Sequence, residues 1–328
     1  MALKVTVGIP VYNGAKFIGA SIESVLNQTF SDFELIVSDD RSTDDTEAIV
    51  CSFSDSRIRY VKNERNLGAP GNFNNCINLA KGHYVYLLHA DDVMLPRNLE
   101  RKIKVMDANL NVGMVHSNIY QIDESGKVLD THWEKRYHED LILDGYKYFL
   151  ELISNGNLIC APSVMIRKSC YEKLGGFDCR ISHSCDWEMW LRISLFYDVA
   201  YIVEPLVLYR FHEEMDTNRY LNNVRGIDQA FKAKHFILQK FPGMIPDLKG
   251  IKQTICAHYS RRALALAYDC DDNGNYDELK KCLSFLLRVD PKRVLNISVF
   301  KLALKAFLGK SITNKLRKRT IVTSSDGV

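Results

Sequence analysis

Two adjacent carboxylates, Asp91 and Asp92, follow an apolar run that begins at Tyr84. Two like charges beside a low-dielectric sheet repel each other, and each loses hydration, so the pair is costly without a cation or hydrogen-bond donors. A hard ion such as Mg²⁺ or Mn²⁺ is the natural partner, because it accepts carboxylate oxygens and keeps positions free for a diphosphate. The pair therefore predicts a divalent-metal site. The alternative interpretation is a helix cap, with Asp92 capping a segment that begins near Pro96.

A second acidic pair, Asp39 and Asp40, follows the apolar run 33–38. The residues from Ser42 to Asp45 are good N-cap residues, and capping the next helix is the simpler interpretation for them. Asp39 and Asp40 come too early for that role. They are better placed to accept hydrogen bonds from the N–H groups of a ligand such as a uracil ring.

The elements that must position these acids alternate between short β-branched runs and helical patterns. Such alternation, with nearly all-apolar strands, predicts an α/β fold with a mainly parallel central sheet flanked by helices on both faces. Ligands gather at the carboxyl ends of the strands in such sheets, and polar residues mark three of these ends. The predicted strands are 5–10, 33–38, 58–61 and 84–89, and the predicted helices are 17–27, 43–53, 72–80 and 99–109.

Composition and absent motifs exclude several other classes. Neither G-x-G-x-x-G nor G-x-x-x-x-G-K-[ST] occurs, so the usual dinucleotide and P-loop cradles are missing. The net charge is only +3, without a basic aromatic stripe through the body of the chain, so no nucleic-acid partner is expected. Nine scattered cysteines without a C-x-x-C pair favour a reducing compartment. No apolar stretch approaches the ~18 residues that cross a bilayer, and the first residues predict a strand instead of a secretion signal. A cytoplasmic location is expected.

Four segments together resemble the family 2 inverting glycosyltransferases of the GT-A fold. They are Val5–Asn13, Ser24–Phe30, Phe33–Asp40 and the His89–Asp92 turn. Each is weak alone, but their order and spacing are specific, and the match covers residues 1–215. The resemblance implies a nucleoside diphosphate sugar as the donor, and the family context is the assembly of bacterial surface polysaccharides such as O-antigen.

In that family, the turn after the first strand and the aspartates after the second hold the nucleoside. The resemblance therefore assigns Pro10, Tyr12 and Asn13, together with Asp39 and Asp40, to the base and ribose. A half-buried aromatic at a strand edge is an equally good interpretation of Tyr12.

The segment 66–74 resembles the stretch of the family that runs beneath the diphosphate sugar. Asn66, Gly68, Asn72 and Asn74 stand at the recurrent positions, where amides can donate to phosphate or sugar oxygens. A glycine turn capped by asparagine is nearly as good an interpretation of Asn72.

The metal motif departs from the Asp-x-Asp triplet of the family, because the triplet here is His89-Ala90-Asp91, followed by Asp92. By resemblance, Asp91 takes the metal-binding position and Asp92 supports it. The triplet also contacts the nucleotide, while the role of His89 stays open between a ligand, a phosphate contact and packing.

The segment Leu208–His212 resembles the closing Tyr-Arg-x-His element of the family. His212 would then be a further metal or diphosphate ligand, and Arg210 a contact for the diphosphate. Without the resemblance, a structural histidine is the better interpretation.

Transfer to a hydroxyl needs a base, because the pKa of a hydroxyl is far too high for it to ionise at neutral pH. The segment 175–192 resembles the acidic helix start of the family, and Asp186 matches its catalytic base. Capping of the helix that begins there is the alternative role for Asp186. Glu188 is predicted to be exposed, and Trp187 and Trp190 to lie in the core or the acceptor wall.

The domain prediction is a GT-A domain at 1–215, with a nucleotide-binding half (1–122) and an acceptor half (123–215), followed by a helical region at 216–328. Near the end of the chain, one helical face is apolar and basic residues surround it. The pattern suits an anionic membrane surface, and a plain docking helix with a solvated charged face is the alternative. The apolar residues are Phe300, Leu304, Phe307, Leu308, Ile312 and Leu316.

The predicted function is inverting, metal-dependent transfer of a sugar, expected from a UDP-linked donor, to an acceptor hydroxyl. A lipid-linked saccharide at the inner face of the plasma membrane is the expected acceptor. Two alternatives stay open: a nucleotidyltransferase acting on sugar phosphates, which would release pyrophosphate, and a non-catalytic nucleotide-sugar-binding protein.

Overall fold

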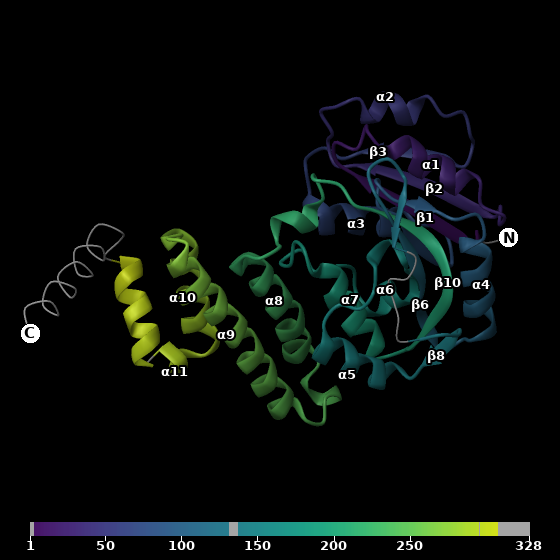
Figure 1. Cartoon of the computed structure of the whole chain (residues 1–328). Helices are drawn as coiled ribbons and strands as arrows, with labels where there is room; N and C mark the ends of the chain where they lie inside the picture. Colours follow the sequence, from purple (N-terminus) through teal and green to yellow (C-terminus); the bar gives the residue numbers. More distant parts are fainter. Residues whose placement is uncertain (1–2, 131–136, 295, 308–328) are drawn as a thin grey trace, which may run out of the picture. The chain divides into compact units, whose positions relative to one another are not determined.

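The computed structural model describes residues 3–130, 137–294 and 296–307. The chain divides into two compact units, and the boundary lies between Met215 and Asp216. The first unit is an α/β domain, and the second contains only helices among its described residues (Figure 1).

The first unit is built on a ten-stranded sheet within the described residues, in the order β3-β2-β1-β4-β9-β6-β10-β5. Its first half is parallel and consists of β1 (Val5–Val11), β2 (Phe33–Asp39), β3 (Ile58–Lys62) and β4 (Tyr84–Leu87). The predicted strands and their parallel pairing are confirmed there. Their carboxyl ends therefore meet at one edge of the sheet.

The second half of the sheet is mixed. β6 (Val112–Ile122) and β10 (Asp198–Arg210) are parallel, while β9 (Met165–Arg167) and β5 (Val93–Met94) pair antiparallel with their neighbours. Two short strands, β7 (Val128–Asp130) and β8 (Leu141–Leu143), pair antiparallel with β6 and β10. The pairing of β5 with β10 brings Arg210 beside the loop that follows β4, although they are far apart in sequence.

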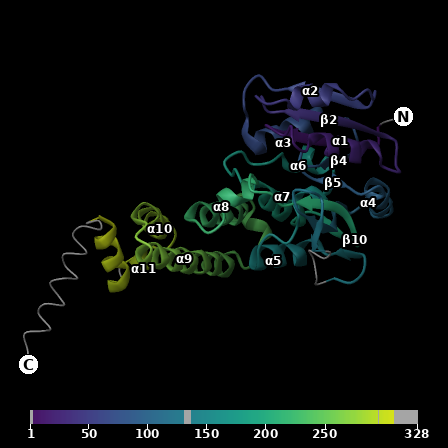
Figure 2. The same cartoon turned by 45° about the horizontal axis from the view of Figure 1, so that its top comes forward.

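Helices cover both faces of the sheet (Figures 1 and 2). α1 (Ile18–Leu26) buries Ile18, Ile22 and Val25, spaced by three or four residues, in the same apolar core as β1 and β4. α3 (Gly68–Leu79) lies against the other face, where a Cβ added to Gly8 would stand 2.9 Å from the Cβ of Cys76. The other helices of this unit are α2 (Thr46–Cys51), α4 (Asn98–Ala108), α5 (Gly145–Asn155), α6 (Lys168–Leu174) and α7 (Cys185–Ser194).

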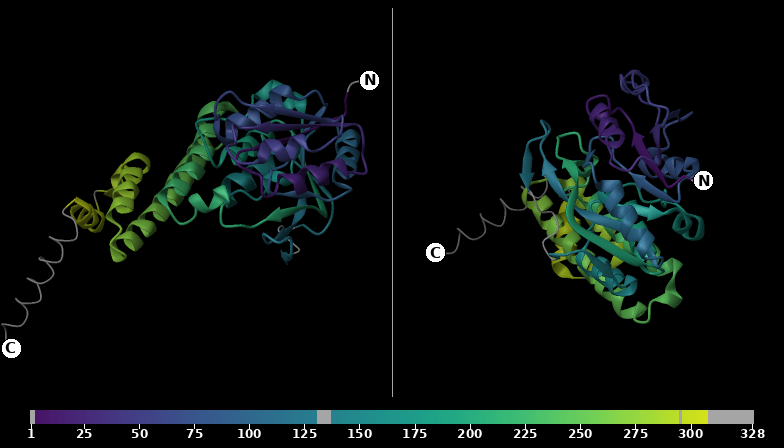
Figure 3. Two further views of the ribbon diagram at one scale, coloured as in Figure 1. Left: turned by 90° about the horizontal axis from the view of Figure 1, so that it is seen from above. Right: turned by 90° about the vertical axis from the view of Figure 1, so that its right-hand side faces the viewer.

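The second unit packs α8 (Val224–Lys240), α9 (Leu248–Asp272) and α10 (Tyr276–Val289), followed by the short α11 (Pro291–Val294) and a helix over 297–307 (Figure 3). Among the residues that the structure describes, no helix has both the length and the apolar character of a membrane-spanning segment. Leu308, Ile312 and Leu316 lie outside the described residues.

Candidate active site

Hydrogen bonds to β1 and α1 hold the turn that follows β4. The backbone N–H of Leu88 donates to the carbonyl of Gly8 (2.9 Å), which extends the pairing of β4 with β1. The hydroxyl of Ser21 on α1 lies 2.8 Å from the carbonyl of Ala90 and 2.7 Å from that of Asp92. Ala90 thus contributes its backbone to the turn, and the turn directs His89, Asp91 and Asp92 to one place.

Asp92 is fully buried, and its two carboxylate oxygens differ. Oδ1 accepts a hydrogen bond from the backbone N–H of Arg210 (2.9 Å). Oδ2 has no hydrogen-bond partner among residues 3–130, 137–294 and 296–307, and lies 3.7 Å from Nδ1 of His89. Burial and the charge of Asp91 raise the pKa of Asp92 well above its usual value. The capping alternative is wrong, because α4 begins at Asn98 with Arg97 at the N-cap position.

Asp91 is one third exposed, and its Oδ2 lies 3.0 Å from Nε2 of His212. Burial alone would raise the pKa of Asp91, but the bond to His212 and the positive potential of His89 and His212 hold that pKa below its usual value. Ligand atoms of His89, Asp91 and Asp92 lie within 4.8 Å of one another. We call these three residues, with His212, the acid–histidine cluster.

Carboxylate oxygens are the donors that suit Mn²⁺ and Mg²⁺ in proteins, and imidazole nitrogens are common ligands of transition-metal ions. The buried, unpartnered Oδ2 of Asp92 is the atom most in need of a cation, since an unsatisfied buried carboxylate oxygen is costly. The ligand atoms of the cluster and the unpartnered Oδ2 of Asp92 therefore fit a divalent ion.

The side chain of Arg210 contacts three segments of the chain next to the acid–histidine cluster. Its Nε donates to the carbonyl of Asp91 (2.9 Å), and its Nη1 donates to the carbonyls of Asp123 (3.2 Å) and Glu124 (3.0 Å). The guanidinium also lies over the ring of Phe17, 4.8 Å from its centre, and the ring of His212 contacts the same phenyl group. Most of the hydrogen-bonding capacity of Arg210 is thus used inside the protein.

A small pocket connects His89 to Asp186. Phe73 of α3 stacks on His89, with ring centres 5.9 Å apart, and its edge meets Phe177 at 5.3 Å. Both aromatic rings form walls of the pocket. Its lining consists of Phe73, Leu87, His89, Ala161, Val164, Ile166, Tyr171, Phe177, Asp186 and Trp190.

Asp186 lies in the first turn of α7, one residue after its start at Cys185. Its Oδ1 accepts from the backbone N–H of Trp187 (2.7 Å), and its Oδ2 accepts from the side-chain amide of Asn157 (2.9 Å). Burial raises the pKa of Asp186, although both donors and the charge of His183 oppose the shift. Ser184, not Asp186, occupies the N-cap position.

The prediction for Glu188 is wrong. Its carboxylate and the guanidinium of Arg192, one helical turn later, are both 2% exposed and form an ion pair, with Nε and Oε1 3.1 Å apart. Nearly all of α7 is buried, so both partners lie inside the domain. Trp187 and Trp190 are buried as predicted.

Asp39 and Asp40 lie at the end of β2 and are buried, with protein donors on all four carboxylate oxygens. Asp39 accepts from the backbone N–H of Ser42 (2.7 Å) and the hydroxyl of Tyr60 (2.5 Å). Asp40 accepts from the backbone N–H groups of Leu67 (2.7 Å) and Gly68 (2.9 Å), which begin α3. Asp40 therefore caps α3 from a distant part of the sequence.

The asparagines of the segment 66–74 also bond within the protein. Asn72 is buried and accepts from the hydroxyl of Ser38 (2.6 Å), while its amide donates to the carbonyl of Ser38 (2.8 Å). Asn74 exchanges two hydrogen bonds with the backbone of Phe177 (2.7 and 2.9 Å), which joins α3 to the pocket wall. Asn66 and Gly68 stay at the surface, and Gly68 has a left-handed backbone (φ +72°).

The turn after β1 presents Tyr12, which is 54% exposed, beyond the buried Pro10. Asn13 has a left-handed backbone (φ 52°), accepts from the N–H of Thr43 (2.9 Å) and donates its own N–H to the hydroxyl of Ser42 (2.9 Å). Tyr12 directly follows the last residue of β1 and is about half exposed, so both interpretations of this side chain, a nucleoside contact and a half-buried aromatic at the strand edge, fit the structure.

The sequence did not indicate four side chains that shape this site: Phe17, Phe73, Phe177 and Asn157. Phe73 and Phe177 lie in the segments 66–74 and 175–192, which resemble the family. Nothing in the spacing of the two residues shows that α3 contacts the segment before α7. Asn157 carries no motif at all.

Comparisons with known proteins agree with this geometry. The glycosyl transferase family 2 pattern matches residues 6–175. The uncharacterized glycosyltransferase MJ1057 of Methanocaldococcus jannaschii is 34% identical over 226 residues, which are 67% of this chain and 74% of the relative. WfgD of Escherichia coli, a UDP-Glc:alpha-D-GlcNAc-diphosphoundecaprenol beta-1,3-glucosyltransferase, is 32% identical over 189 residues, 58% of this chain and 69% of the relative.

Solved structures share the fold at low identity. S. aureus TarS 1–349, solved with UDP-GlcNAc, has a TM-score of 0.68 at 16% identity and covers 89% of this chain and 82% of its own. The mannosyltransferase PcManGT from Pyrobaculum calidifontis, solved with GDP-Man and Mn²⁺, has a TM-score of 0.57 at 17% identity, with coverages of 94% and 87%. The fold is that of GT-A sugar transferases. The chain belongs to glycosyl transferase family 2 and is a glycosyltransferase.

Proposed function

We propose that this glycosyltransferase moves a sugar, with inversion, from a UDP-linked donor to an acceptor hydroxyl. The observation that carries the proposal is the pocket shared by His89 and Asp186. It places a carboxylate of raised pKa beside a cluster of acids and histidines suited to a metal-bound diphosphate.

Asp91, Asp92 and His212 would hold the ion, Mg²⁺ or Mn²⁺, and His89 lies within reach of the same site. A divalent ion held there would supply positive charge to the diphosphate and so stabilise the charge that develops as the diphosphate leaves. Arg210 keeps the cluster in place, because its backbone N–H donates to the carboxylate of Asp92 and its Nε donates to the backbone carbonyl of Asp91, and its Nη2 is the group proposed for the diphosphate.

Asp186 would accept the proton of the acceptor hydroxyl as that oxygen attacks the sugar carbon from the face opposite the leaving diphosphate. A carboxylate with a raised pKa is a stronger base, and so better matched to a proton transfer near neutral pH. Asn157 fixes the orientation of its Oδ2. Phe73, Phe177 and Trp190 enclose the pocket and keep water away from the reacting groups.

The donor side of the proposal rests on the two loops that follow β1 and β2. Tyr12 offers an exposed ring for a base, with Pro10 and Asn13 shaping its turn. Asp39 and Asp40 would hold the base and ribose while they keep their protein donors, because each carboxylate oxygen can accept more than one hydrogen bond. Asn66, Gly68, Asn72 and Asn74 would support the diphosphate sugar from the start of α3.

For the acceptor, we propose a lipid-linked saccharide at the inner face of the plasma membrane. WfgD, which resembles this chain, is named for such an acceptor. We further propose that residues 1–122 form the nucleotide-binding half, residues 123–215 the acceptor half, and residues 216–328 a helical region with a basic amphipathic tail.

Replacement of Asp186 by Asn tests the mechanism. We expect transfer to fall by about 10²–10⁴-fold, the usual contribution of a general base, while UDP-sugar binding is retained. Product analysis measures transfer, and a thermal-shift titration measures donor binding. Unchanged turnover in this variant would remove Asp186 from the mechanism.

The released product distinguishes the classes of function. Nucleoside diphosphate supports the transferase, pyrophosphate would indicate a nucleotidyltransferase, and donor binding without either product would indicate a non-catalytic binder. A rise in the melting temperature with UDP that requires Mn²⁺ or Mg²⁺, and that is lost in Asp91→Asn, supports the metal assignment without reference to turnover.

A further inference from the structure

The helix over 297–307 carries apolar side chains on two different faces. Asn296 begins it, since its Oδ1 accepts from the N–H of Ser298 (2.9 Å) and its carbonyl accepts from the N–H of Phe300 (2.9 Å). The docked face consists of Val299, Leu302 and Ala306, each at most 2% exposed.

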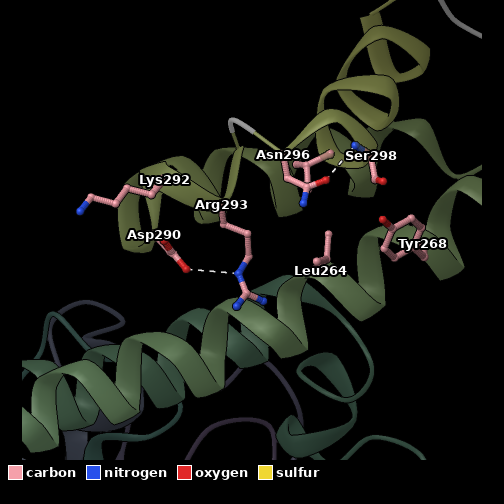
Figure 4. A pocket seen from close by; sticks show the side chains of 8 residues that line it. Leu264, Tyr268, Asp290, Lys292, Arg293, Asn296 and Ser298 are labelled. Atoms are coloured by element: carbon pink, nitrogen blue, oxygen red, sulfur yellow. Dashed lines mark hydrogen bonds and ion pairs between the residues drawn. The ribbon is translucent and has the colours of Figure 1, made fainter.

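The contacts on the docked side fix the rotation of this helix about its axis. Asn296 and Ser298 face Leu264 and Tyr268 of α9 across a groove, and Arg293, which pairs with Asp290 just before α11, lines another part of the same groove (Figure 4). Further along, Lys305 forms an ion pair with Asp271 at the end of α9. The helix therefore cannot turn its other side inward without breaking these contacts.

The other side presents what we call the outer apolar face: Ile297, Phe300, Leu304 and Phe307. Their exposed fractions run from 45% to 81%, and their spacing of three and four residues makes them one stripe. At 3.6 residues per turn, this stripe lies roughly 140° around the helix from the docked face. Contiguous exposed apolar surface of this kind marks an interaction site.

The basic residues around the outer apolar face indicate which kind of partner it binds. Lys301 borders the outer apolar face, and the sequence from 291 to 325 holds nine Lys or Arg and no Asp or Glu, whereas the rest of the chain holds 34 basic and 40 acidic residues. An apolar stripe flanked only by cations fits the boundary between acyl chains and anionic headgroups, where such helices lie flat.

We propose that the outer apolar face docks this protein onto an anionic phospholipid bilayer. Phe300 and Phe307 enter the acyl boundary, and Lys301 stays among the headgroups. The sequence left a membrane helix and a plain docking helix as alternatives. Among residues 216–294 and 296–307, Phe300, Leu304 and Phe307 stay exposed, while the separate docked face of Val299, Leu302 and Ala306 is buried.

Co-sedimentation of the full chain with vesicles tests this proposal. We expect binding to vesicles of equimolar phosphatidylcholine and phosphatidylglycerol, weak binding to pure phosphatidylcholine, and weaker binding at high salt. The double variant Phe300→Ser/Phe307→Ser should lose about tenfold or more in vesicle affinity, since two large apolar side chains no longer enter the bilayer. Leu110→Ser, which removes an equally exposed apolar side chain from the first unit (82%), should bind like the wild type.

Equal melting temperatures of these variants show that they are folded, and binding is scored without donor, acceptor or metal, so transferase activity does not affect the outcome. Vesicle binding that the double variant retains in full overturns the proposal, as does absence of binding by the wild type. Light scattering that shows a wild-type dimer and a monomeric double variant also overturns it, because the stripe would then be a contact between copies of this chain.

Discussion

Asp39 and Asp40 end β2, and Asp91 and Asp92 follow β4, so β1 alone separates the two acidic pairs in the sheet. Every oxygen of the first pair accepts a hydrogen bond from a protein donor. In the second pair, Oδ2 of Asp92 is buried without a hydrogen-bond partner among the described residues. The same sequence pattern thus stabilises the fold in the first pair, beside the role proposed for it in nucleoside binding, and leaves one buried carboxylate oxygen without a protein donor in the second.

Of the substitutions in the two acidic pairs, Asp92→Asn should have the largest effect on turnover. We expect turnover to fall on the order of a hundredfold or more, because the metal contribution of several kcal/mol is weakened. With a chelator present, the melting temperature should stay equal or rise. The pKa of Asp92 is higher in the folded than in the unfolded protein, so the ionised carboxylate costs stability at neutral pH, and that cost vanishes only below the unfolded pKa.

Turnover assays and thermal melts in chelator measure both effects. If Asp92→Asn melted well below the wild type without metal, the carboxylate of Asp92 would stabilise the fold as that of Asp40 does. The two acidic pairs would then not differ in this respect.

Asp40→Asn, unlike Asp92→Asn, should lower the stability of the fold. An amide in place of the carboxylate turns an N–H₂ group toward at least one of the N–H groups of Leu67 and Gly68, so we expect a loss of about 2–3 kcal/mol in the free energy of unfolding. Urea denaturation measures this loss. Asp45→Asn is the matched control, because Asp45 is exposed and makes no capping bond, and should change stability by less than about 0.5 kcal/mol.

These contrasts show what the sequence could predict. Strand and helix positions in the first half followed from apolar periodicity, because local patterns determine those elements. The role of Asp40 did not follow, since its partners Leu67 and Gly68 come 27 and 28 residues later. Glu188 was predicted as exposed because charged residues rarely lie inside, and the burial of nearly all of α7 explains why its ion pair with Arg192 lies inside the domain.

Each carboxylate oxygen of Asp186 accepts one hydrogen bond, as in the first acidic pair, while burial raises the pKa of Asp186, as it does for Asp92. Because the pKa of Asp186 is raised, turnover should fall as the pH drops through a value above the usual range for aspartate. The hydrogen bond from Asn157 lowers this pKa, so Asn157→Ala should move the acid limb of the pH profile to higher pH. Initial rates across pH measure the shift. A limb that moves to lower pH would contradict the assignment of Asp186 as the base.

The smallest expected effect is that of Tyr60→Phe, which removes the hydroxyl that donates to Oδ2 of Asp39. We expect a loss of about 1 kcal/mol, at the low end for an unsatisfied buried acceptor, because Tyr60 is only partly buried and water can replace its hydroxyl. Urea denaturation measures it, and Tyr268→Phe, which alters a 41% exposed tyrosine, is the control. If Tyr60→Phe instead left stability unchanged, the hydrogen bond to Asp39 would not stabilise the fold, and the contrast with the unpartnered oxygen of Asp92 would be weaker.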